Sequence, residues 1–175
     1  MEIRRLIYIG VLVAQALVLY IFESMIPAPF ITPGAKLGLA NLIIVIGIYT
    51  LDNYKECIIL IFLKLILSTL LMGSISTFIF GLGGTVLSFI SMIFVKNILK
   101  DKVSAIGVST VGGVFHNVGQ LLVASLIIKN IGLMSYLPFL SIAGIGTGIF
   151  IGVTANYLLK HMKRINSFSA SKNIF

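Results

Sequence analysis

The stretch GGVFHNVGQL, residues 112–121, places three hydrogen-bonding side chains inside a run that is otherwise apolar or glycine. The run covers about residues 103–128, which is long enough to cross the hydrocarbon core of a bilayer as a helix. His116, Asn117 and Gln120 fall within about one helical turn, where polar groups need partners inside the protein. The stretch therefore predicts a membrane fold with a buried polar site.

The composition of the whole chain agrees with a membrane fold. Of its 175 residues, 58% are hydrophobic and 10% are charged, and the mean hydropathy is +1.12. A soluble domain carries charges on about a quarter of its residues. The single cysteine, Cys57, excludes an internal disulfide and a cysteine metal cluster. We expect an all-α membrane protein with no cofactor, no metal site and no soluble catalytic module.

Six apolar windows follow one another along the chain. They cover about residues 6–26, 36–51, 55–72, 75–95, 103–128 and 133–159. All connections but the first are short, which favours antiparallel neighbours. The predicted fold is a six-transmembrane-helix bundle of residues 1–162 followed by a mobile cytoplasmic tail, 163–175. The first window resembles a signal peptide but lacks a cleavage motif, so we expect it to be retained as a helix.

Positive charge is distributed unevenly between the predicted sides of the membrane. With the N-terminus inside, ten of the 13 Lys and Arg residues fall on inner segments, and only Lys36 and Lys129 on outer ones. The positive-inside rule then places both termini in the cytoplasm. We attribute the net charge of +8 to this topology and not to nucleic-acid binding.

Polar side chains of several windows fall at similar depths. Lys64 lies in the middle of the third window, where an ammonium costs about 2.5–3.5 kcal/mol and should face water or a partner. Spacings of three and four residues predict one helix face for His116, Asn117 and Gln120. We expect a substrate pocket in the outer half, beneath the proline-rich first loop, with the candidates Glu23, Lys36, Asn41, Lys64, His116, Asn117 and Gln120. Its partly cationic wall favours an anionic or amphipathic ligand.

Structural roles explain some of the same residues. An Asn or Gln within a membrane helix usually bonds a neighbouring helix, which is an alternative for Gln15, Asn41 and Asn156. Lys64 can instead bond a backbone carbonyl, or extend its ammonium towards the interface.

Glycines suggest where helices approach closely. In GIGTGIFIG, the four-residue spacing of Gly144, Gly148 and Gly152 predicts a helix-packing face. In FGLGGT, residues 80–85, Gly81, Gly83 and Gly84 fit either close packing or a loosened helix next to a ligand. Gly10 and Ala14 form a flat face on the first window, which can hold another subunit or a helix of the same chain.

Two motifs resemble a known family. The stretches PFITPGAKLGLANL (29–42) and FHNVGQL (115–121) resemble the Gx transporter family of small bacterial membrane proteins, also labelled heptaprenyl diphosphate synthase component I. The resemblance covers about 160 residues, with GAKLGLAN and HNVGQ as its more specific motifs.

In general build this family is similar to the S components of energy-coupling factor (ECF) transporters. That resemblance implies six helices and an outward pocket holding Lys36, Asn41, His116, Asn117 and Gln120. It also implies a first helix that docks through Gly10 and Ala14 on a coupling subunit with partner ATPases. The alanine repeat typical of S components is missing from that helix.

The two family labels imply different functions. A prenyl diphosphate synthase needs clustered aspartates to hold magnesium, whereas this chain has only Asp52 and Asp101, on separate loops. It also lacks the G-x-x-x-x-G-K-[ST] motif of ATPases. We therefore do not expect an enzyme.

The favoured prediction is a substrate-binding component of the bacterial cytoplasmic membrane, S-component-like, for uptake of a small anionic or amphipathic metabolite. A partner ATPase complex would drive it. One alternative is a non-catalytic accessory protein of isoprenoid or quinone metabolism or membrane electron transfer. Another is an ion-coupled carrier in which Glu23, Lys64 or His116 titrates.

Overall fold

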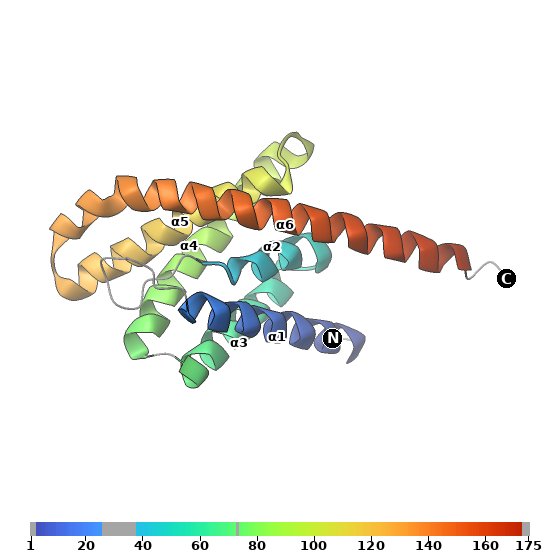
Figure 1. The fold of residues 1–175 in the computed structure, drawn as a ribbon, viewed down its shortest axis with the longest axis horizontal. Coiled ribbons are helices and arrows are strands. Elements are labelled where there is room, and N and C mark those ends of the chain that lie inside the picture. The colour runs from blue at the N-terminus through green and yellow to red at the C-terminus, as the bar shows by residue number, and fades with distance from the viewer. Residues whose placement is uncertain (1–2, 26–37, 73, 173–175) are drawn as a thin grey trace.

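The computed structural model describes residues 3–25, 38–72 and 74–172, which are almost entirely helical (Figure 1). The elements in order are α1 (Ile3–Met25), α2 (Asn41–Thr50), α3 (Tyr54–Met72), α4 (Ile75–Leu99), the 3-10 helix η1 (Lys100–Lys102), α5 (Ala105–Ile128), the 3-10 helix η2 (Ile131–Tyr136) and α6 (Leu137–Lys172). These ranges contain no β-strand, so the all-α prediction is confirmed.

Four helical segments of the described chain are long and apolar enough to cross a membrane. They are Ile3–Met25, Ile75–Leu99, Ala105–Ile128 and Ile131–Arg164. The helix α3 has 19 residues but carries three charged side chains, Lys55, Glu56 and Lys64. The chain is thus a helical membrane protein.

The helix α2 is shorter than the sequence predicted. Its 10 residues span about 15 Å, which is half of a hydrocarbon core of about 30 Å. It nevertheless contacts each of the other five α-helices, and eight of its ten residues are buried. A helix that is apolar on all sides belongs in such a central position.

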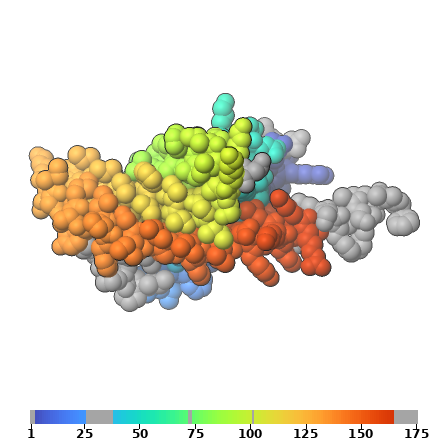
Figure 2. Space-filling view, turned by 90° about the horizontal axis from the view of Figure 1, so that it is seen from above, coloured from blue at the N-terminus to red at the C-terminus, as the bar shows by residue number. Residues whose placement is uncertain are grey.

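Glycines allow α4, α5 and α6 to pack closely, and the three helices lie across one broad face of the molecule (Figure 2). Gly144, Gly148 and Gly152 all lie against the α5 backbone. A Cβ atom on Gly148 would lie 2.6 Å from the Cα atom of Thr110, closer than side chains approach a backbone. This interface requires glycine.

Polar side chains fix several helix ends. The hydroxyl oxygens of Ser74 and Ser104 accept hydrogen bonds from backbone N–H groups in the first turns of α4 and α5. Lys129 ends α5 in the left-handed conformation, at φ 53°. The helix α6 continues to Lys172, so the predicted boundary at residue 162 falls inside a helix.

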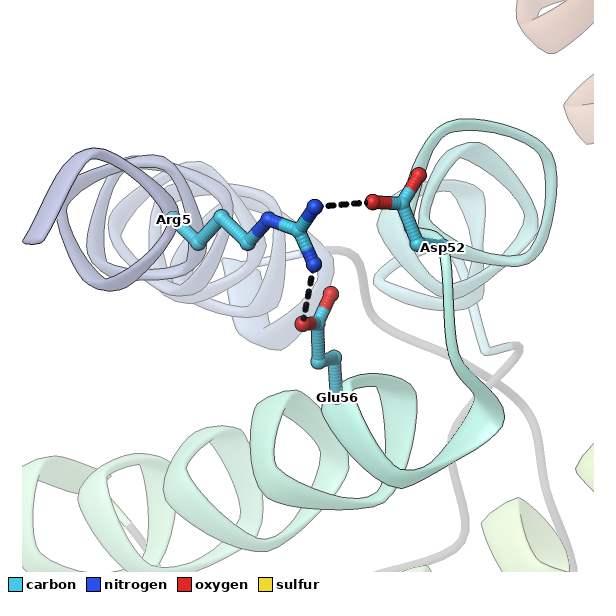
Figure 3. A network of polar contacts seen from close by, with 3 residues as sticks. All are labelled: Arg5, Asp52 and Glu56. Carbon is cyan, nitrogen blue, oxygen red and sulfur yellow. Dashed lines mark hydrogen bonds and ion pairs between the residues drawn. The ribbon is translucent and has the colours of Figure 1, made fainter. Parts of the chain in front are cut away.

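The first residues of α1 and the last of α6 lie at the same end of the bundle (Figure 1). Here the guanidinium of Arg5 contacts the carboxylates of Asp52, at 2.5 Å, and of Glu56, at 3.5 Å (Figure 3). These contacts join α1 to the start of α3 and to the turn before it.

Candidate functional site

A small cavity lies between α1, α3, α4 and α5, beside the start of α2. It is lined by Tyr20, Glu23, Gly38, Lys64, Leu65, Ser68, Thr69, Thr77, Gly81, His116 and Gln120. Its volume of about 30 Å³ is enough for about two water molecules. Four of the seven substrate-binding candidates named from the sequence therefore lie around one cavity.

The cavity holds two opposite charges in a membrane bundle. Glu23 lies near the end of α1 and Lys64 near the middle of α3, and each side chain is only 5% exposed. Burying such groups costs several kcal/mol unless other polar groups compensate. Their placement around a polar cavity, with hydroxyl and amide neighbours, supplies that compensation.

Glu23 accepts a hydrogen bond from the backbone N–H of Gly38, with its Oε1 atom 2.5 Å from the nitrogen. Gly38 has φ +86°, a conformation that favours glycine. A Cβ atom there would also lie 2.8 Å from Cδ2 of His116 and 2.9 Å from Nδ2 of Asn41. Gly38 thus brings α1, α2 and α5 together at one point.

His116 and Gln120 form a pair on α5, with the Nε2 atoms of the two side chains 2.5 Å apart. His116 lies half-way along α5 and is 3% exposed. Its Nδ1 atom faces the backbone of Gly84 and makes no hydrogen bond of normal geometry within the described chain. Both side chains of the pair line the cavity.

Asn41 lies beside this group, at the first position of α2. Its side chain is buried, and its Oδ1 atom has no hydrogen-bond partner among the described residues. A buried amide oxygen without a partner is costly, so this position is suited to a water molecule or a ligand group.

Asn117 does not join the cavity, contrary to the expectation that it shares a face with His116. Its Nδ2 donates a hydrogen bond of 2.7 Å to the backbone oxygen of Leu140 in α6. Consecutive helical residues point about 100° apart, so His116 faces the cavity while Asn117 faces α6. Lys36 and the first loop lie outside the described residues.

Replacing Asn117 by Ala should therefore lower stability and spare ligand binding. Polar contacts between membrane helices contribute about 0.6 kcal/mol on average and at most about 1.7 kcal/mol. We expect the free energy of unfolding of Asn117→Ala, measured by thermal unfolding in detergent, to be lower by about 1 kcal/mol. His116→Ala should instead lose the ligand. If Asn117→Ala lost the ligand with its stability unchanged, this placement of Asn117 would be wrong.

Several lining residues were not predicted from the sequence. Ser68 follows Lys64 by four residues and Tyr20 precedes Glu23 by three, so helical spacing from the charged residues identifies both. The hydroxyls of Ser68 and Thr69 donate to the backbone oxygen of Leu65. Their oxygen lone pairs are thus directed away from the helix and add acceptors to the site.

The glycines of α4 have different neighbours. Gly81 lines the cavity, whereas Gly83 and Gly84 lie against α5. A Cβ atom on Gly84 would lie 2.9 Å from Cε1 of His116. The helix α4 is continuous through these positions, so close packing explains Gly83 and Gly84 and the loosened helix does not occur.

The geometry defines a helical membrane protein with a buried, mixed-charge pocket. Within the described ranges, no three His, Cys, Asp or Glu side chains come together as metal ligands. The chain belongs to the heptaprenyl diphosphate synthase component I family, whose model matches residues 12–158. No match was found among curated proteins or solved structures.

Proposed function

We propose that the protein is the substrate-binding component of an uptake system in the bacterial cytoplasmic membrane. The observation that carries this proposal is the convergence of Glu23, Lys64, His116 and Gln120 on one buried cavity. Ionisable residues within membrane helices are costly and typically mark substrate or ion pathways.

Two features favour an anionic or amphipathic ligand. The ammonium of Lys64 carries three N–H donors, so it can serve a ligand and a protein group at once. The positive end of the α2 dipole lies next to the cavity, and half-helices present this end to anionic substrates in transporters. Glu23 contacts Gly38 just before α2, where a carboxylate is electrostatically favoured.

The size of the cavity supports a cycle with more than one conformation. Metabolite sites usually have volumes of about 300–1,000 Å³, far above the 30 Å³ found here. A metabolite therefore requires the cavity to widen. In the proposed cycle both termini are cytoplasmic, and the cavity opens to one side of the membrane and then to the other.

The exposed face of α1 favours the proposal that the protein binds a partner complex. Gly10 and Ala14 are both exposed, and no described atom lies within 4 Å of a Cβ placed on Gly10. This face is open at Gly10, and at Ala14 it borders a groove between α1, α2 and α6. We assign it to a transmembrane coupling subunit with ATPases.

A second candidate function is a non-catalytic subunit of isoprenoid metabolism, which the family description favours. The structural observation that favours this second function is an apolar groove of about 680 Å³ between α1, α2 and α6. Leu12, Leu19 and Ile43 are among its lining residues, and they would suit a prenyl chain.

Native mass spectrometry of the protein purified in mild detergent separates the two functions. We expect a co-purifying polar metabolite, and we expect His116→Ala to lose it. A polyprenyl lipid retained equally by the wild type and by His116→Ala would support the accessory subunit and contradict the proposed uptake function.

A further inference from the structure

A second polar cleft lies away from the cavity, at the end of the bundle where α1 begins. It is lined by Tyr49 of α2, Lys96 and Asn97 of α4, Lys100 of η1, and Val103. Its volume of about 450 Å³ falls within the range of small-ligand sites. The proposed uptake function does not use this cleft.

Lys96 is held in a defined position at the cleft. Its Nζ atom donates a hydrogen bond of 2.6 Å to the backbone oxygen of Ile48, in the last turn of α2. The same atom lies 4.5 Å from the centre of the Tyr49 ring. These contacts leave N–H donors of the ammonium for another acceptor.

Asn97 adds an amide donor beside Lys96. Its Oδ1 atom accepts a hydrogen bond of 2.8 Å from the hydroxyl of Tyr54. This bond orients the side chain, and the amide N–H groups of Asn97 can donate to another acceptor.

Lys100 stands where the backbone favours glycine. Its φ of 44° and ψ of −117° are rare for a residue with a side chain. Strained positions of this kind persist mainly at functional sites. Lys100 places a second ammonium at the cleft, and none of the described lining residues is a carboxylate.

We propose that this cleft binds the phosphate of an anionic phospholipid headgroup. Lysine ammonium groups bind phosphate as point charges, and basic pockets between membrane helices recognise lipid headgroups. Leu99 follows Lys96 by three residues and so shares its side of α4, and its exposed apolar side chain provides a surface for an acyl chain. A lipid thus matches both the charge of the cleft and its surroundings.

The test compares two lysines that share a backbone feature. Lys100 and Lys129 both end helices at positive φ, but Lys129 lies at the other end of the bundle. Lys100→Gly and Lys129→Gly each remove one charge and each relieve the backbone, so neither should impair folding. Native mass spectrometry then measures the preference of each variant for phosphatidylglycerol over phosphatidylcholine of equal chain length.

We expect wild-type protein and Lys129→Gly to prefer phosphatidylglycerol, and Lys100→Gly to lose about fivefold of that preference, since one surface lysine contributes about 1 kcal/mol. Equal losses in the two variants, or no preference in the wild type, would overturn the proposal. Inorganic phosphate that displaces phosphatidylglycerol from the wild type would support the phosphate contact. Inorganic phosphate that binds without competing with the lipid would overturn the lipid assignment.

Discussion

Lys64→Met is expected to abolish binding of the metabolite in the cavity while the helical fold is retained. Removing one partner of a buried, hydrogen-bonded charge typically costs about 2–5 kcal/mol, which corresponds to a loss of affinity of about 30-fold or more. Met is apolar and similar in length to Lys, so it should fill the same space in α3. The measurement is the amount of metabolite retained by native mass spectrometry, followed by a binding titration once its mass identifies it.

Lys55→Met is the matched control for this variant. Lys55 is on the same helix but exposed and outside the cavity, so its loss should leave binding unchanged. Unchanged affinity in both Lys64→Met and His116→Ala would remove the assignment of the cavity as the ligand site.

Gly148→Ala should destabilise the protein severely. The added methyl would lie 2.6 Å from Cα of Thr110 and 2.7 Å from the backbone oxygen of Ser109. Neither atom can move without shifting α5, so α5 and α6 must separate. We expect the free energy of unfolding to be lower by about 3 kcal/mol, which is at the upper end for overpacked sites. The midpoint of thermal unfolding, monitored by circular dichroism, should be lower by about 10 °C.

Gly146→Ala provides the control on the same helix. No described atom lies within 4 Å of a Cβ placed on Gly146. The alanine should therefore leave the free energy of unfolding unchanged or raise it by up to about 1 kcal/mol through its helix propensity. Equal unfolding midpoints for the two variants would show that α5 and α6 do not pack as closely as described.

The sequence could predict that Lys64 and His116 lie near the middle of their helices, but not the direction of every side chain. Position along a membrane helix gives depth, because each residue advances about 1.5 Å, and Lys64 and His116 are both near the middle of apolar runs. The three-residue spacing from Asn117 to Gln120 is compatible with Asn117 facing either the cavity or α6. Only the positions of α4 and α6 decide between them, and hydropathy contains no information on those positions.

The length of α2 and the roles of the α4 glycines also required the structure. The apolar window at 36–51 does not reveal that Gly38 adopts positive φ before a helix that begins at Asn41. Gly83 fits closely because Gly119 of α5 lies opposite, 36 residues away in the sequence. Pairings at that distance are not visible in a local pattern.

The short helix α2 is held at both ends by charges. The carboxylate of Glu23 contacts Gly38 before its first turn, and the ammonium of Lys96 contacts Ile48 in its last. Each charge has the sign that the helix dipole favours, and each contributes about 0.3–1 kcal/mol. A ligand that draws Glu23 away would break the contact before the first turn of α2, while the contact of Lys96 with its last turn remains. The helix α2 can then transmit a change in the cavity to the opposite end of the molecule.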